Sequence, residues 1–269
     1  MVMTAYETEK TLDLQAKDRT QSLTGRDTAS LAAGVLPLCK PEGVTSFRMV
    51  QLVRRILGIK KVGHTGTLDP FASGVLVVCA GRPATRLIPE LMEGDKEYEA
   101  ILQLGVLTDT HDPEGKVIAK RQVPLLSAED ISDCLARFTG EQLQRPPAYS
   151  ALKHKGKPLY YYARKGMEVK KEPRLITIKE LHCLGLDRET IALRVVCSKG
   201  TYIRALAADI GEFLGCGAHL AKLKRTRNGF FSLDETIPGE KLFNSESGIR
   251  LLDAHKIPVN KINELLGGN

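Results

Sequence analysis

Residues 63–79 read GHTGTLDPFASGVLVVC, a glycine-rich polar loop that runs into a continuous apolar segment. The apolar part, Val75–Cys79, is short and rich in β-branched residues, which predicts a buried strand. The glycines of the loop permit a tight backbone and the close approach of a ligand. Pro70 favours an extended conformation at Asp69 and prevents a helix from continuing through it. We therefore expect a rigid loop that presents Asp69 to a cleft, although Asp-Pro pairs also serve as simple turns.

The segments around this loop predict a mixture of helices and strands that do not strictly alternate. A helix is expected after Thr45 or Ser46, which can cap it, and Gly58 ends it. Its predicted inner face is Phe47, Val50, Val53 and Leu57. Residues 98–105 alternate between apolar and polar side chains, which is typical of a half-buried strand.

The second half of the chain continues the mixture. Residues 127–130 resemble a capping box, and the helix after it would bury Ile131, Cys134, Leu135 and Phe138. We expect paired strands at 175–186 and 191–197, a helix at 201–214, and short strands at 218–223 and 229–233. The fold class predicted is α+β, with a mixed, largely antiparallel central sheet flanked by helices.

Charge is concentrated in one part of the chain. The net charge is +7. Residues 145–174 hold nine basic and two acidic residues, so this one segment carries an excess as large as that of the whole chain. A basic balance favours a polyanionic partner, because each Lys or Arg placed on a phosphate releases counterions.

Several classes of chemistry lack their sequence signatures. The sequence has no phosphate-binding P-loop, dinucleotide fingerprint, nucleophile elbow or zinc deaminase motif. Cys216 and His219 have half of a metal site's spacing, and we interpret them as turn and core residues. We therefore expect no cofactor and no metal.

The remaining composition bears on location. The six cysteines include no C-x-x-C pair, which favours a reducing compartment, and no apolar stretch reaches membrane-spanning length. Residues 1–33 are polar and aperiodic, without the apolar core of a signal peptide, and predict a mobile tail. We expect a cytoplasmic protein that is not bound to a membrane.

Several motifs follow one another in a fixed order along the chain. They are KPEG at 40–43, the loop at 63–74, DKEY at 95–98, YSALK at 149–153 and CSKGTYIR at 197–204. Together they closely resemble the TruB family of tRNA pseudouridine-55 synthases, and the resemblance runs from about residue 34 to about residue 233. It implies a pseudouridine synthase fold and isomerisation of uridine 55 in the T loop of tRNA, without a cofactor and by base flipping.

The same resemblance implies roles for individual residues. Asp69 matches the catalytic aspartate, Arg204 the arginine that pairs with it, and Tyr98 the tyrosine that stacks on the target base. The other matches are His64, which would contact the rearranged RNA loop, and the pocket residues Lys40, Tyr202 and Leu223. Residues 145–174 match an insertion that clamps the T arm, with Lys153, Lys155, Lys157, Arg164 and Lys165 as its cations.

The chemistry agrees with these residue types. The uridine must lose its N1–C1′ bond, rotate, and re-attach through C5. An ionised carboxylate at Asp69 can attack C1′ or remove the C2′ proton, and the sequence leaves both routes open. A nearby Arg204 would favour the charged form of Asp69.

The resemblance also defines the expected domains. The catalytic domain would span residues 34–240, followed by a short C-terminal segment at 241–269, too short for a full PUA domain. Cys39 stands where the family usually has Asp. We expect a monomer that binds tRNA without an obligate protein partner. Two alternatives are a non-catalytic RNA-binding or RNA-folding module and a dyskerin-like synthase that depends on guide RNA.

Overall fold

A computed structural model describes residues 33–150, 152–167, 169 and 171–267. The predicted N-terminal tail therefore lies outside the described residues, apart from Ala33. Residues 33–269 form one compact unit. Within the described part, none of the helices has the length and apolar composition needed to cross a membrane.

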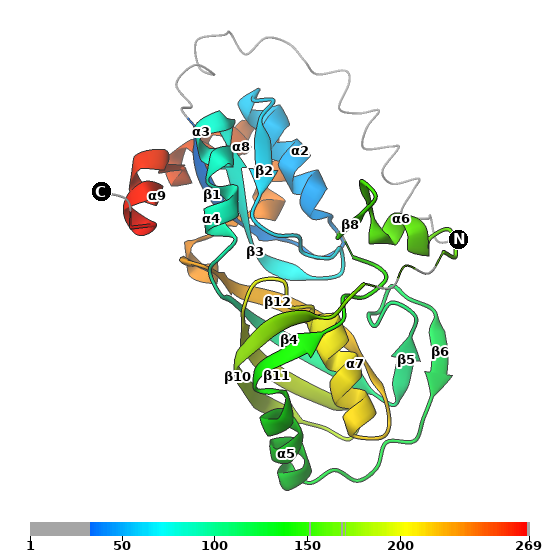
Figure 1. Ribbon diagram of the computed structural model, residues 1–269. Helices are drawn as coiled ribbons and strands as arrows, with labels where there is room; N and C mark the ends of the chain where they lie inside the picture. Colours follow the sequence, from blue (N-terminus) through cyan, green and yellow to red (C-terminus); the bar gives the residue numbers. More distant parts are fainter. Residues whose placement is uncertain (1–32, 151, 168, 170, 268–269) are drawn as a thin grey trace. The chain divides into compact units, whose positions relative to one another are not determined.

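An 11-stranded sheet organises the described residues (Figure 1). Its main path runs β14-β1-β3-β12-β4-β11-β10-β7, with β13, β15 and β2 pairing at its sides. The bounds are β1 Gly34–Lys40, β2 Val62–His64, β3 Ser73–Ala80, β4 Lys96–Leu104, β7 Gly140–Gln144, β10 Arg174–Leu186, β11 Thr190–Cys197, β12 Ala218–Asn228, β13 Phe231–Ser232, β14 Ile237–Pro238 and β15 Ile257–Pro258. The β1–β14 and β3–β12 pairs are parallel, and the other pairs are antiparallel. The predicted fold class, a mixed and largely antiparallel sheet with flanking helices, is confirmed.

Helices pack on both parts of this sheet, the part formed by β4, β10, β11 and β12 and the part around β1 and β3. Helices α5 (Ala128–Phe138) and α7 (Ile203–Phe213) lie beside β4, β10, β11 and β12, and close a core that includes Leu102, Leu193 and Leu206 (Figure 1). The β1–β3 part carries the helices α2 (Ser46–Leu57), α3 (Gly81–Arg86), α4 (Ile88–Leu91), α8 (Ser245–His255) and α9 (Val259–Leu265). There are also two short hairpins, β5 Val106–Thr108 with β6 Val117–Lys120, and β8 Lys153–His154 with β9 Lys157–Pro158, which precedes α6 Leu159–Ala163. Two 3-10 helices, η2 Leu233–Glu235 and η3 Gly239–Phe243, follow β13 and β14.

The C-terminal residues are part of the same sheet. Ile257 pairs with Val35 of β1, and Ile262 of α9 packs in a buried cluster with Val35 and Val77. Residues 257–262 therefore help to build the β1–β3 part of the sheet, although they lie beyond the domain boundary predicted at residue 240.

Two local predictions were wrong. Phe47 is 56% exposed, while Met49 and Ile56 occupy the inner face of α2 with Val50 and Val53. The sequence at 218–223 continues as one strand of 11 residues, because β12 carries two bulges and buries polar side chains that interrupt the apolar pattern.

Candidate active site

The loop between β2 and β3 holds Asp69 through contacts at several points. Thr45 caps α2 by accepting from the Arg48 amide, which leaves Ser46 free to bind the loop. The Ser46 hydroxyl accepts from the Leu68 amide and donates to the Leu68 carbonyl, both at 2.9 Å. Because these bonds are buried and involve the residue before Asp69, they fix the backbone from which the carboxylate projects.

Lys40 anchors the other side of Asp69. Its side chain is fully buried, and its ammonium donates to the carbonyls of Pro41, Val44 and Pro70 at 2.8, 2.6 and 3.3 Å. Burial lowers the pKa of Lys40 to about 8, although the charge of Asp69 acts in the opposite direction. Lys40 therefore lies beneath the loop and does not line the cavity described below.

Arg225 joins both ends of the same loop. Its Nε donates to the Val75 carbonyl at 2.8 Å and its Nη2 donates to the Gly66 carbonyl at 3.1 Å. The residue is almost completely buried, and it pairs in register with Tyr98 of β4. One side chain therefore links the start of the loop to the start of β3, beside a tyrosine of β4.

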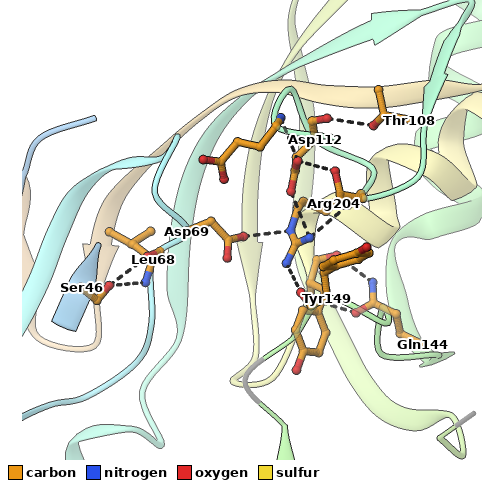
Figure 2. A network of polar contacts seen from close by, with 11 residues as sticks. Ser46, Leu68, Asp69, Thr108, Asp112, Gln144, Tyr149 and Arg204 are labelled. Atoms are coloured by element: carbon orange, nitrogen blue, oxygen red, sulfur yellow. Dashed lines mark hydrogen bonds and ion pairs between the residues drawn. The ribbon is translucent and has the colours of Figure 1, made fainter. Parts of the chain in front are cut away.

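Arg204 lies at the start of α7 and contacts two carboxylates (Figure 2). Its Nε lies 2.8 Å from Asp69 Oδ2, and its Nη1 lies 3.1 Å from Asp112 Oδ2. It also donates to the carbonyls of Thr110 and Tyr149, at 3.0 and 2.7 Å. These four contacts hold the guanidinium in one orientation, since its fork of donors is planar.

The start of α7 is fixed by a separate contact. The Gln144 side chain accepts from the Tyr202 amide at 2.8 Å and donates to the Tyr202 carbonyl at 3.1 Å. Gln144 ends β7, so the edge strand of the sheet places the first turn of the helix that carries Arg204.

Charges around Asp69 act in opposing directions. Burial raises the pKa of the Asp69 carboxyl, the Arg204 guanidinium lowers it, and the neighbouring Asp112 carboxylate raises it. The net direction is upward, because burial is the largest of these effects. Arg204 favours the charged form of Asp69, as the sequence predicted, but its guanidinium does not outweigh burial and the Asp112 carboxylate.

A cavity of about 250 Å³ opens beside this pair. Asp69, Arg204, Tyr98, Tyr202 and Leu223 line it, so the structure brings together five of the seven predicted pocket residues. Ser150 and Arg225 also line it. About one third of the Asp69 side chain is exposed, whereas the Arg204 side chain is almost completely buried. The carboxylate is therefore open to a ligand, while the guanidinium serves as its fixed support.

His64 does not line this cavity. Its Nδ1 accepts from the Gly66 amide at 3.2 Å, and burial lowers its pKa. Such a contact is also typical of an ordinary loop histidine, so its predicted contact with RNA stays a prediction.

The predicted RNA-clamping cations are exposed. Lys153 and Lys157 belong to the β8–β9 hairpin, Lys155 lies in its turn, and Arg164 and Lys165 follow α6. The Lys157 and Lys165 ammoniums lie 4.3 and 4.6 Å from the centroid of the Tyr161 ring. None of the five lines the cavity, so their predicted role concerns a surface separate from it.

Cys216 and His219, which have half of a metal site's spacing, lie in the structure as core residues. Cys216 is buried, and the His219 ring is 2.9 Å from the Val106 carbonyl. Within the described residues, no three histidine, cysteine, aspartate or glutamate side chains are grouped to hold a metal ion.

Sequence reasoning missed two residues of the site, Asp112 and Arg225. Asp112 is buried in the polar turn after β5, where the Thr110 hydroxyl donates to its carboxylate at 2.5 Å. Arg225 alternates with exposed Lys224, and the same face of β12 buries Leu223. That alternation was a usable signal, but the bulges in β12 and the charge of Arg225 obscured it.

Comparison with known proteins identifies the fold and then the family. The family model described as TruB family pseudouridylate synthase (N terminal domain) matches residues 54–203. The model described as tRNA pseudouridylate synthase B C-terminal domain matches residues 204–256. The architecture is therefore a pseudouridine synthase fold. The chain belongs to the TruB family of pseudouridylate synthases.

Curated relatives support this assignment over most of the chain. The tRNA pseudouridine synthase B of Desulfotalea psychrophila is 60% identical over 210 residues, covering 76% of this chain and 85% of that protein. The protein of the same name from Stutzerimonas stutzeri is 47% identical over 229 residues, covering 84% and 74%.

Solved structures give the same result for the fold. A chain from a Cbf5-Nop10-Gar1 complex matches with a TM-score of 0.65 at 32% identity, over 86% of this chain and 61% of that one. A chain from an H/ACA RNP bound to a substrate RNA containing 2′-deoxyuridine matches with a TM-score of 0.64 at 27% identity, over 92% and 69%.

Proposed function

We propose that this enzyme isomerises uridine to pseudouridine in tRNA, at position 55 of the T loop, and that the Asp69 carboxylate performs the reaction. The observation that carries the role of Asp69 is its partly exposed carboxylate at the wall of a cavity, 2.8 Å from the buried Arg204. The substrate class follows from relatives named tRNA pseudouridine synthase B at up to 60% identity.

The reaction is an isomerisation, so uridine and pseudouridine contain the same atoms, and one carboxylate is enough to carry it out. The N1–C1′ bond of uridine breaks, the uracil rotates, a C5–C1′ bond forms, and the C5 proton is lost while N1 gains a proton. Asp69 either attacks C1′ or removes the C2′ proton, and both routes need its ionised form. Arg204 keeps the carboxylate in one orientation because its other contacts are to Asp112 and to two backbone carbonyls.

The target base must leave its stack to reach this cavity. Tyr98 and Leu223 line the cavity beside Asp69, and both are buried. Flipping a base loses a few kcal/mol of stacking and pairing, and an aromatic ring such as Tyr98 replaces part of that loss. We propose that Tyr98 stacks on the flipped uracil.

Binding of the rest of the tRNA would fall to the basic insertion at residues 145–174. The side chains of Lys153, Lys157 and Lys165 are exposed, so phosphates can reach them. Base-independent phosphate contacts of this kind position an RNA without selecting its sequence. The selection of one uridine would then come from the cavity and from the folded shape of the T arm.

The proposal is tested with an unmodified tRNA transcript and no guide RNA. We expect conversion of uridine to pseudouridine at position 55 alone, mapped by sequencing of the modified transcript. Conversion at another position would contradict the T-loop assignment. Activity that appears only after guide RNA is added would favour the guide-dependent alternative, and tight binding without conversion would favour the RNA-folding module.

A further inference from the structure

Ser150 is a cavity residue whose hydroxyl has no partner. Four buried side-chain atoms of the described residues lack a hydrogen-bond partner: Arg54 Nε, Ser150 Oγ, Thr226 Oγ1 and Asn228 Oδ1. Of these four residues, Ser150 is the one that lines the cavity beside Asp69. Its residue is 4% exposed, so bulk water does not readily compensate for the missing bond.

The backbone around Ser150 is held on two sides. Arg204 Nη2 donates to the carbonyl of the preceding Tyr149 at 2.7 Å. The carbonyl of Ser150 itself accepts from the Tyr160 amide of α6 at 3.2 Å. The backbone that carries the hydroxyl is therefore held by Arg204 on one side and by α6 on the other.

A buried hydroxyl without a partner lowers stability, because it has lost its bonds to water and gained none. Such a group is explained when a ligand supplies the missing bond. At Ser150 the ligand must enter the cavity that holds the Asp69–Arg204 pair, and a nucleotide offers both carbonyl acceptors and ribose hydroxyls.

We propose that Ser150 Oγ forms a hydrogen bond with the target nucleotide in the cavity and orients it relative to Asp69. This inference rests on the proposed function, since it assumes a uridine of tRNA as the occupant. Ser150 then acts on the substrate, whereas Arg204 and Asp112 act on the carboxylate. The hydroxyl would contribute after the base has flipped, and not to the initial binding of the tRNA.

The test compares Ser150→Ala with the wild-type enzyme and with Ser132→Ala, which removes an exposed hydroxyl from α5. Three quantities are measured: the single-turnover rate constant of pseudouridine formation, the Kd for tRNA, and the Tm. We expect Ser150→Ala to lower the rate constant about tenfold, in line with the loss of one hydrogen bond in the reacting complex. The Kd should stay within twofold, and the Tm should be unchanged or higher, because no bond within the protein is lost.

The outcomes separate this inference from the proposed function. No conversion by the wild-type enzyme would refute the proposed function itself. Conversion by the wild type with less than a threefold loss in Ser150→Ala would overturn the role of the hydroxyl alone. A loss of rate accompanied by a fall in Tm would also overturn it, because it would reveal a structural partner for Ser150. A larger loss of rate in Ser132→Ala than in Ser150→Ala would do the same.

Discussion

Asp69 and Asp112 share the guanidinium of Arg204, an arrangement that fixes the Asp69 carboxylate and leaves part of it exposed. Asp112 is buried and holds the far side of the arginine, so the guanidinium cannot rotate away from Asp69. The Asp69 carboxylate in turn is open on one side to the cavity. At the scale of single residues, the proposed function therefore requires that Arg204 stays in this orientation and that Asp69 is ionised.

The first prediction concerns the shared arginine. In Asp112→Asn the side chain keeps its shape but loses its charge, so its bond to Arg204 weakens. We expect the single-turnover rate constant to fall about tenfold while the Kd for tRNA changes little. The matched control is Asp133→Asn, an exposed carboxylate on α5, which should leave the rate unchanged. An Asp112→Asn variant as fast as that control would show that the second carboxylate does not support Arg204.

The second prediction concerns pH. Burial raises the pKa of Asp69 above its ordinary value of 3.8, and both reaction routes need the ionised form. The rate should therefore rise with pH through an apparent pKa above 3.8, measured by single-turnover assays across the acid range. Because the native state holds this proton more tightly than the unfolded chain, the contribution to stability is greatest below 3.8 and is lost as pH rises through the native pKa. An acid limb at or below 3.8 would contradict the assignment.

At the scale of elements, the loop that carries Asp69, between β2 and β3, depends on how closely β3 approaches β12. Gly74 pairs with Arg225 in the parallel β3–β12 contact. A Cβ at Gly74 would lie 2.2 Å from the Arg225 carbonyl oxygen, at a φ of +106° that disfavours other residues. The loop can therefore return to the sheet at this point only through a glycine.

The third prediction tests this close approach. Gly74→Ala should lower the free energy of unfolding by about 3 kcal/mol or more, because backbone clash adds to backbone strain. Gly140→Ala is the matched control, since Gly140 has a similar φ of +101° but no atom within 4 Å of an added Cβ. The control should lose only about 1–2 kcal/mol. Equal losses in denaturant unfolding would show that the contact with β12 is unimportant.

Secondary structure was predicted correctly from the sequence where local interactions decide it, and wrongly where tertiary contacts decide it. The strand at Val75–Cys79 and the capping box at Ser127 were predicted because each depends on local pattern and local hydrogen bonds. Phe47 was misplaced because helical spacing alone does not decide which of two apolar stripes meets the sheet. The length of β12 was underestimated because bulges and buried charge hide the alternation of a strand.

The site residues also fall into two groups, those predicted from sequence motifs and those that were missed. Asp69 and Arg204 were found from motifs 135 positions apart, and the structure brings them into direct contact. Asp112 and Arg225 were missed because a polar residue in a turn or a cationic residue in a strand is usually exposed. The three-dimensional arrangement shows that Arg225 is buried against the loop that carries Asp69, and that Asp112 is buried against Arg204.

At the scale of the whole molecule, the proposal assigns recognition to two separate places, the cavity and the basic insertion. In the proposed function the cavity receives the reacting nucleotide, whereas residues 145–174, which carry a charge excess equal to that of the whole chain, bind phosphates. Phosphate contacts release counterions, so their number can be read from the dependence of the tRNA affinity on salt.

The fourth prediction uses that dependence. Replacing Lys153, Lys157 and Lys165 by Gln should weaken tRNA binding and reduce the slope of log affinity against log salt by about 2–3. The control replaces the exposed lysines Lys60, Lys120 and Lys261, which changes the net charge equally. The same change of slope in both triple variants would show that the insertion has no special role in binding tRNA.

The most direct measurement of the central claim is single-turnover conversion of unmodified tRNA by Asp69→Asn, with the tRNA affinity measured on the same preparation. The amide keeps the size of the side chain, but it has lost the negative charge that faces Arg204 and the cavity. We predict no pseudouridine above background, together with a Kd within about threefold of the wild type. Conversion by Asp69→Asn at a rate close to that of the wild-type enzyme would contradict the account.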